Sequence, residues 1–195
     1  MTLQEINSDP FSIASVFILK NRERITIRPL VKNDASAFGI FLDNLSEETR
    51  SRFGPHPISS DEAKIICNNL DYARMLRLVT LNIKKEIIGY MILSFQLRDS
   101  QLLRYEGYKI SLVKDRDICI APVVADGYQN SGVGSEMLRE TIAIAKQLRV
   151  KQIILWQGTQ LTNTRAIHFY EKFGFQKSGE FEKYGNTNVD MTLTL

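Results

Sequence analysis

The stretch from Asp117 to Leu148 reads DICIAPVVADGYQNSGVGSEMLRETIAIAKQL, and it decides the predicted fold. An apolar run at 118–124 leads through a turn that contains Gly132 and Gly134 into a segment whose apolar residues recur every three or four positions. This order predicts a buried strand, a glycine-containing loop and an amphipathic helix. Because the first amides of a helix lack intrahelical acceptors, the loop favours an anion, and a diphosphate above all.

The loop departs from two common nucleotide-binding patterns. A P-loop needs Lys and then Ser or Thr directly after its second glycine, but Val133 and Gly134 follow Gly132. A Rossmann fingerprint needs a third glycine or alanine three residues beyond Gly134, where Met137 stands. Both nucleotide interpretations are therefore weak, and a nucleotide-phosphate binder is kept only as a rival hypothesis.

Two other patterns carry a resemblance to a known family. Residues 129–134, QNSGVG, fit Gln/Arg-x-x-Gly-x-Gly/Ala, which resembles the coenzyme-A-binding signature of the GNAT superfamily of N-acetyltransferases. Residues 163–175, NTRAIHFYEKFGF, look like the other GNAT signature, Asn-x-x-Ala-x-x-Phe-Tyr-Glu-Lys-x-Gly-Phe. The two patterns occur in the family's order, with one predicted buried strand at 152–156 between them. The resemblance covers roughly residues 25–195.

The resemblance implies an α/β (α+β) fold with a mixed, largely antiparallel central sheet flanked by helices. In this family the strands ending near Val124 and Trp156 would run parallel and then splay apart at the cofactor site. The pantetheine arm of the cofactor would insert between them like a substitute strand. Pro122 suits such a place, because it removes a ladder donor and favours a bulge.

The rest of the chain divides into an N-terminal extension, residues 1–24, and a GNAT domain, residues 25–195. Residues 74–83 and 86–95 are typical of a hairpin. Helices are expected after an N-cap at Asn33 or Asp34, after Ser60, and from a cap at Thr162 or Asn163 through Phe173, with Gly174 ending the last one. Two closing strands are predicted at 175–177 and 188–195. The polar stretch 96–115 is long for a loop, so it either carries its own strand or covers something.

The resemblance implies acetyl transfer from acetyl-CoA to a primary amine by direct attack within a ternary complex. Tyr170 is the predicted catalytic residue: its hydroxyl would protonate the leaving thiolate, and a thiol pKa near ~8.5 against ~10 for tyrosine makes that transfer reasonable. The predicted cofactor-binding residues are Ile120, Val123, Val124, Gln129, Asn130, Ser131, Gly132, Val133, Gly134, Ser135, Asn163 and Ala166. An amide near Val123 or Val124 would polarise the thioester, and the amides of 131–135 would hold the diphosphate.

The general base and the acceptor stay open at this level. Glu106, Asp115, Asp117 or a water chain are alternatives for the base, with Glu47 or Glu48 in the acceptor-side helices as further candidates. The acceptor side would be built from residues 45–57 and 96–115, whose charges are mixed in sign. The acceptor is therefore either a small-molecule amine or a protein or peptide amine.

Composition sets further bounds. The 195 residues are 44% hydrophobic and 24% charged with a net charge of +3, so neither nucleic acid nor a membrane is implied as a partner. His56 is expected to be structural or solvated and His168 to lie on the surface, and neither has metal-ligand spacing.

Cys67 and Cys119 are interpreted as reduced core thiols, which favours a cytoplasmic location, and no signal peptide is predicted. The family leaves room for a homodimer. A non-catalytic acetyl-CoA-binding or regulatory module on the same fold is the alternative function.

Overall fold

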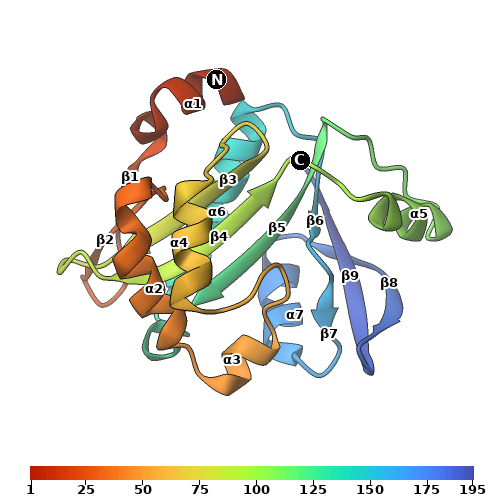
Figure 1. The fold of residues 1–195 in the computed structure, drawn as a ribbon. Coiled ribbons are helices and arrows are strands. Elements are labelled where there is room, and N and C mark those ends of the chain that lie inside the picture. The colour runs from red at the N-terminus through yellow and green to blue at the C-terminus, as the bar shows by residue number, and fades with distance from the viewer.

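One nine-stranded sheet organises the protein, and helices cover both of its faces in the computed structural model, which describes residues 1–195 (Figure 1). The strand order is β1-β2-β3-β4-β5-β6-β9-β7, with β8 paired to β9. The strands are β1 Ser15–Ile18, β2 Arg24–Pro29, β3 Met75–Leu81, β4 Ile87–Ser94, β5 Asp117–Val124, β6 Gln152–Leu155, β7 Thr159–Gln160, β8 Gln176–Lys183 and β9 Asn186–Thr194. The helices are α1 Leu3–Ser8, η1 Pro10–Ile13, η2 Lys32–Asp34, α2 Ala35–Asp43, α3 Glu47–Ser51, α4 Ser60–Asn68, α5 Asp99–Gly107, η3 Asp126–Tyr128, α6 Val133–Gln147 and α7 Thr164–Lys172.

The predicted fold class is confirmed. All strand pairs are antiparallel except β5–β6, which runs parallel from Asp117↔Gln152 to Ile120↔Leu155. The predicted hairpin at 74–95 is present as β3–β4. A parallel pair needs a crossover connection, and α6 supplies it between β5 and β6.

Two hydrophobic cores lie on opposite faces of the sheet. One contains buried residues of α1, α6 and α7, and the other contains residues of α2, α4 and α5. Helix α6 shows how the sequence produces this: Met137, Leu138, Ile144 and Ala145 form its inner stripe and are all buried. Strand β4, with every residue buried, separates the two cores.

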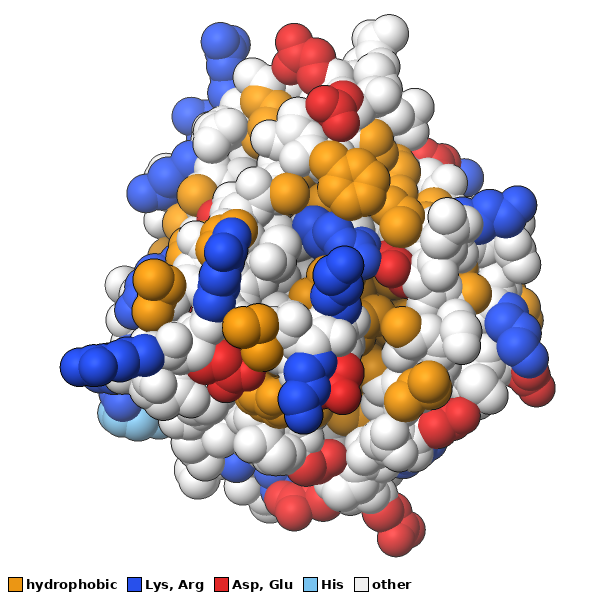
Figure 2. Space-filling model, turned by 90° about the vertical axis from the view of Figure 1, so that its left-hand side faces the viewer, with side chains coloured by type: hydrophobic (Ala, Val, Ile, Leu, Met, Phe, Trp, Pro, Cys, Tyr) orange, Lys and Arg blue, Asp and Glu red, His pale blue; other side chains and the backbone are white.

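The N-terminal segment joins the sheet. Strand β1 pairs with β2 from Ser15↔Ile27 to Ile18↔Arg24, and Ile6, Ile13 and Leu19 are buried in the core. Figure 2 views the molecule from the β1–β2 side and shows hydrophobic side chains exposed among Lys and Arg side chains. The boundary between an extension and a domain at residue 25 stays a prediction.

Of the two alternatives for residues 96–115, the second is confirmed: the segment contains no strand and covers part of the sheet. The segment carries helix α5, which lies beside β8 and β9 (Figure 1). Arg104 of α5 forms an ion pair with the fully buried Asp190 of β9, with Nε 2.5 Å from Oδ2, and its guanidinium lies 3.9 Å from the centre of the Phe181 ring. Strand β8 also begins near its predicted start but runs on to Lys183, past the expected end at 177, because the whole segment pairs with β9.

Candidate functional site

The β5–β6 pair opens at its carboxyl end. Its last hydrogen bond runs from the Trp156 amide to the Ile120 carbonyl, 2.9 Å, while β5 continues to Val124. The Ala125 amide donates to Ile88 of β4, so backbone groups at odd-numbered positions of β5 face β4. The backbone groups of Pro122 and Val124 therefore face the gap, and the amide available there is that of Val124 rather than Val123.

Pro122 does not produce the expected bulge. The β4–β5 register runs without a shift from Gly89↔Val124 to Ser94↔Cys119. The missing N–H of Pro122 would point into the gap and not toward β4, so no ladder hydrogen bond is lost. The strand accommodates the proline because that position faces the gap, where no strand is paired. The prediction of a bulge at Pro122 is therefore wrong.

The N-terminus of α6 is left uncapped beside this gap. Gly132 occupies the N-cap position in a left-handed conformation, φ +100°, and no side chain caps the helix. By contrast, Ser46, Ser59 and Asn163 each cap their own helix with a side-chain oxygen. No group of the chain accepts from the amides of Asn130, Gly132, Val133 and Gly134, whereas Ser131 and Ser135 donate to Tyr128 and Gly132 carbonyls. The unpaired amides thus differ slightly from the predicted set of 131–135.

A single cavity of about 1120 Å³ connects the gap with the glycine loop. Tyr170 and every predicted cofactor-binding residue line it except Val133, whose side chain is fully buried in the core. Gly134 presents open backbone there: a Cβ atom at this position would lie 3.6 Å from Val124 Cγ2 and 3.8 Å from Phe169 Cζ. The structure therefore brings the predicted residues into one place.

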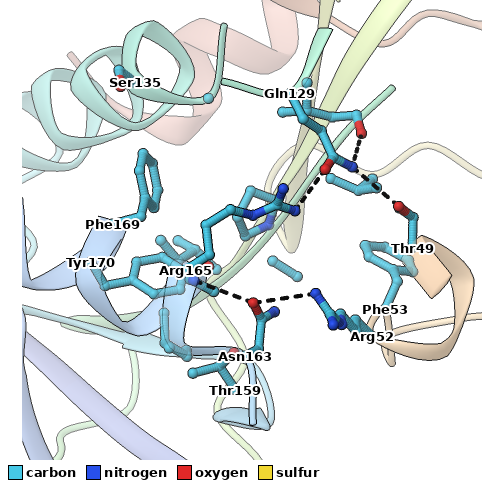
Figure 3. Close-up of a pocket in the computed structure, with 18 of the residues that line it drawn as sticks. Thr49, Arg52, Phe53, Gln129, Ser135, Thr159, Asn163, Arg165, Phe169 and Tyr170 are labelled. Carbon is cyan, nitrogen blue, oxygen red and sulfur yellow. Dashed lines mark hydrogen bonds between the residues drawn. The ribbon is translucent and has the colours of Figure 1, made fainter. Parts of the chain in front are cut away.

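Tyr170 projects from α7 toward this cavity (Figure 3). Its ring packs between Phe169 and Phe175, each with its ring centre 5.3 Å away. No other group of the chain hydrogen-bonds to its hydroxyl. Burial raises the pKa of Tyr170, so the hydroxyl is a proton donor at neutral pH.

Two walls of the cavity are tied together by side chains (Figure 3). The Arg165 guanidinium donates to Gln129 Oε1 at 2.6 Å, and Gln129 Nε2 donates to Thr49 Oγ1 at 3.1 Å. Asn163 Oδ1 accepts from the Ala166 amide, 3.3 Å, as a helix cap, and from Arg52 at 3.4 Å.

Asp126 anchors α3 to the loop that precedes α6. Its carboxylate accepts from the Ser46 amide at 2.8 Å, the Ser46 hydroxyl at 2.7 Å and the Thr49 hydroxyl at 2.6 Å. Although desolvation acts in the opposite direction, these hydrogen bonds from Thr49 and Ser46 lower the pKa of Asp126. This carboxylate is thus engaged in holding α3.

Of the five carboxylates considered as general base, only Glu48 lines the cavity. Asp117 lies at the other end of β5, is buried, and accepts from the Val113 and Gln152 amides. Glu106 is exposed on α5, and Asp115 lines a separate smaller pocket. The carboxylates that do line the cavity are Glu48, Asp126 and Glu136.

The two histidines have opposite surroundings. His168 is exposed on α7, as predicted. His56 is structural: its ring packs against Phe53 and Tyr90, and its Nδ1 lies 2.7 Å from the Pro57 carbonyl oxygen. Burial of the ring lowers the pKa of His56 to about 4, helped by the charge of Arg77 and opposed by the hydrogen bond to Pro57. No three His, Cys, Asp or Glu side chains are arranged to hold a metal ion.

Several lining residues were missed by the sequence reasoning. They come from the segment that runs from β6 to β7 and from the β8–β9 hairpin, and they include Gln157, Gln160, Lys183, Asn186 and Asn188. Of the two stretches expected on the acceptor side, 45–57 lines the cavity, with Arg52 and Phe53 among its residues, whereas no residue of 96–115 does. Arg165 lies inside the second sequence pattern, at a position that the pattern leaves free. The only available signal was the polar character of 157–164, which is also typical of an ordinary loop.

With this geometry established, comparison with known proteins gives the family. The model of the acetyltransferase (GNAT) family matches residues 41–175. The chain therefore belongs to the GNAT family of acetyltransferases. No curated protein sequence matches it.

Solved structures show the same fold at low sequence identity. The GNAT domain of PAT from S. lividans is 19% identical, with a TM-score of 0.75 over 95% of this chain and 99% of that one. RimJ from Mycobacterium smegmatis in complex with CoA-disulfide is 16% identical, with a TM-score of 0.70 over 93% and 86%. A chimera of the spermidine N-acetyltransferase SpeG from Vibrio cholerae and hSSAT is 19% identical, with a TM-score of 0.63 over 87% and 95%. No helix of the protein combines the length and the apolar character that crossing a bilayer requires.

Proposed function

We propose that the protein transfers an acetyl group from acetyl-CoA to a primary amine by direct attack within a ternary complex. The observation that carries the proposal is the gap between β5 and β6, which shares one cavity with the uncapped N-terminus of α6 and with Tyr170. These are the three things that an acetyl-CoA-dependent transferase needs: a slot, an anion site and a proton donor.

The donor would occupy the gap and the glycine loop. Its diphosphate would accept hydrogen bonds from the amides of Asn130, Gly132, Val133 and Gly134, where the positive end of the α6 dipole adds attraction. The pantetheine amides would pair with backbone groups of Pro122 and Val124 in the place of a β-strand. The Val124 N–H would then donate to the thioester carbonyl, where negative charge develops during attack.

Tyr170 would serve the leaving group. When the amine attacks the thioester carbon, the C–S bond breaks and a thiolate leaves. A thiol has an ordinary pKa of about 8.5, so its anion is stabilised by a neighbouring O–H at neutral pH. The raised pKa of Tyr170 keeps this hydroxyl protonated at neutral pH, so it donates a hydrogen bond to the departing sulfur. As Tyr170 passes its proton to the thiolate it takes one in turn from water, and the proton lost by the attacking amine makes up the balance, so that the thiol leaves neutral and Tyr170 stays protonated.

The acceptor amine must lose a proton before it attacks. The carboxylates of Glu48 and Asp126 are engaged by Arg52 and by α3, so we assign no side chain as the base and propose that water carries the proton out. Free thiols at Cys67 and Cys119, both buried, are compatible with the proposed cytoplasmic location.

A thiol-release assay over a panel of primary amines tests the proposal, with wild type compared with Tyr170→Phe. We expect kcat to fall by about 100-fold or more in the variant, in the range typical of a lost general acid, while acetyl-CoA affinity changes little. The phenyl ring keeps the packing against Phe169 and Phe175, so the variant should fold as wild type does, and a loss of kcat would report the missing hydroxyl.

The alternative function is a non-catalytic acetyl-CoA-binding or regulatory module. Tight acetyl-CoA binding without turnover of any amine in the panel would favour it. Thermal stabilisation by ATP or NAD but not by CoA would instead favour a nucleotide-phosphate binder.

A further inference from the structure

The cavity extends well beyond the predicted donor site. At its glycine end, defined by residues 129–135 and 19–21, Leu19 Cδ2 lies 3.7 Å from the position of a Cβ on Gly132. At its far end the lining comes from residues 52–55, from 157–160 and from the tip of the β8–β9 hairpin. We call this the acceptor end. It is closed by the Gln160 side chain, which donates to the Ser51 carbonyl at 3.2 Å, and by the approach of Gly54 to Gln157.

The acceptor end is poor in available negative charge. Its one carboxylate, Glu48, pairs with Arg52 at 2.9 Å, so these two charges cancel. Uncharged amides and hydroxyls account for most of its other polar lining, namely Ser51, Gln157, Thr159, Gln160, Asn186 and Asn188. A polycationic amine would find no free carboxylate here to replace its hydration.

Lys183 supplies a positive charge that forms no ion pair at this end, and its Nζ lies 4.9 Å from the centre of the Tyr184 ring. Along β8, Phe181 and Lys183 turn to the half-buried face, while Glu180 and Glu182 alternate to the exposed face. Lys183 therefore lines the cavity without an acidic partner, whereas Glu182 accepts a hydrogen bond from Thr187. Partial burial and the charges of Arg98 and Arg104 lower the pKa of Lys183.

A second cation reinforces the first. Arg98 lines the neighbouring smaller pocket together with Asp115, and its guanidinium lies 5.2 Å from the centre of the Trp156 ring, which lines both that pocket and the cavity; Arg98 makes no ion pair. Arg104, by contrast, is neutralised by Asp190. Lys183 and Arg98 thus add positive charge near the acceptor end, beside Arg165, which lines the same cavity without an ion pair, and this charge attracts an anion.

We infer that the acceptor is an amine that also carries a negatively charged group, a carboxylate or a phosphate, which Lys183 binds at the acceptor end with Arg98 behind Trp156. This deepens the proposed function and rests on it. A positively charged scaffold such as spermidine is disfavoured, because it would meet like charges.

The test measures kcat/KM at saturating acetyl-CoA for three tripeptides with a free amino terminus that differ only in Asp, Asn or Lys at the second position. Phosphoethanolamine against ethanolamine forms the phosphate arm, and spermidine represents polycations. The anionic member of a set should exceed the neutral one about fivefold or more, as one partly exposed ion pair allows. The arm with the larger ratio identifies carboxylate or phosphate as the source, and its advantage should shrink between 20 and 200 mM salt because screening weakens it.

Variants at one strand give the matched control. Lys183→Gln should raise KM for the anionic acceptors about fivefold, leave KM for the neutral ones within about twofold, and leave acetyl-CoA affinity unchanged. Lys183→Arg should retain the preference. Lys177→Gln removes an exposed lysine of the same strand, paired with Glu171, and should change nothing.

Two patterns would overturn the inference while leaving the proposed function intact: higher kcat/KM for spermidine or the Lys peptide, or an equal rise of KM for all acceptors in Lys183→Gln. A failure of acetyl-CoA to stabilise the protein thermally, or binding without turnover of any amine, would overturn the proposed function and the inference with it.

Discussion

The two ends of the cavity are built by different means. The glycine end presents main-chain amides, which come from the uncapped N-terminus of α6 and from the end of β5 that no longer pairs with β6. The acceptor end presents side chains from three separate segments, held by contacts such as Gln160 to the Ser51 carbonyl. A site made of backbone depends on the conformation of one short stretch, whereas a site made of side chains depends on how distant segments meet.

This difference explains which end can vary. Almost any residue supplies an amide, so the glycine end keeps its ligand chemistry as long as glycine is present where the backbone must be exposed. At the acceptor end, one substitution at position 183 or 157 changes the charge or the shape that the acceptor meets. We therefore expect mutations to separate donor binding from acceptor choice.

The largest expected effect is at the glycine end. Gly134→Glu should weaken CoA binding by about 100-fold or more, because a carboxylate would stand where the diphosphate is proposed to lie. Space exists for the new Cβ, so the fold should survive. Isothermal titration with CoA measures the effect. Gly127→Glu is the matched control, since a Cβ there meets nothing within 4 Å and the residue does not line the cavity; equal affinities in both variants would remove the diphosphate from this loop.

The next prediction concerns the pH dependence of stability and compares variants of the two histidines. The half-buried ring of His56 has its pKa lowered to about 4, so the unfolded chain binds more protons between pH 6.5 and 4, and stability falls as the pH drops through that window. Between pH 7.5 and 4.5 this contribution should cost about 2 kcal/mol of unfolding free energy. Urea unfolding of His56→Gln should show a correspondingly smaller pH dependence than wild type.

His168→Gln provides the comparison, because it removes an imidazole that is exposed on α7 instead of the one packed against Phe53 and Tyr90. The ring of His56 also supports Phe53, which lines the acceptor end. Acceptor KM should therefore rise on acidification before CoA affinity does. An identical pH response of His56→Gln and wild type would place the acid sensitivity elsewhere.

A smaller effect concerns the connection between the ends. Asp126→Ala removes three hydrogen bonds that hold α3, and we expect KM for the acceptor to rise about fivefold while CoA affinity stays within about twofold. Asp126→Asn retains an accepting oxygen, so its acceptor KM should lie between those of wild type and Asp126→Ala. Steady-state kinetics with each substrate varied in turn measures both. A larger change in CoA affinity than in acceptor KM would show that α3 serves the glycine end instead.

The glycine end could be predicted from the sequence because its signals are local. Apolar periodicity identified α6 and β5, and the two glycines identified the loop between them. What periodicity could not supply was the direction of each amide. The choice of Val124 over Val123, and the absence of a bulge at Pro122, follow from the pairing with β4.

Apart from the stretch 45–57, the acceptor end could not be predicted, because its determinants are long-range. Helix α5 mixes buried Gln101 and Tyr105 with exposed polar residues, so its pattern was ambiguous. The buried amide of Gln101 is satisfied because it donates to the Trp156 carbonyl, and Arg104 of α5 pairs with Asp190 of β9. The inward orientation of Lys183 depends on the β8–β9 register, which no local pattern specifies.

The opening between β5 and β6 also affects the rate at which backbone amides exchange their hydrogens with water. The amide of Val124 has no carbonyl to bond, so it should exchange its hydrogen rapidly in the free protein, whereas the Trp156 amide, bonded to Ile120, should exchange slowly. If pantetheine fills the opening as a strand would, the Val124 amide becomes protected from exchange, and the open backbone positions of β5 become hydrogen-bonded. The donor would then complete the architecture as well as the chemistry, and the molecule that the acceptor meets would be stiffer than the free one.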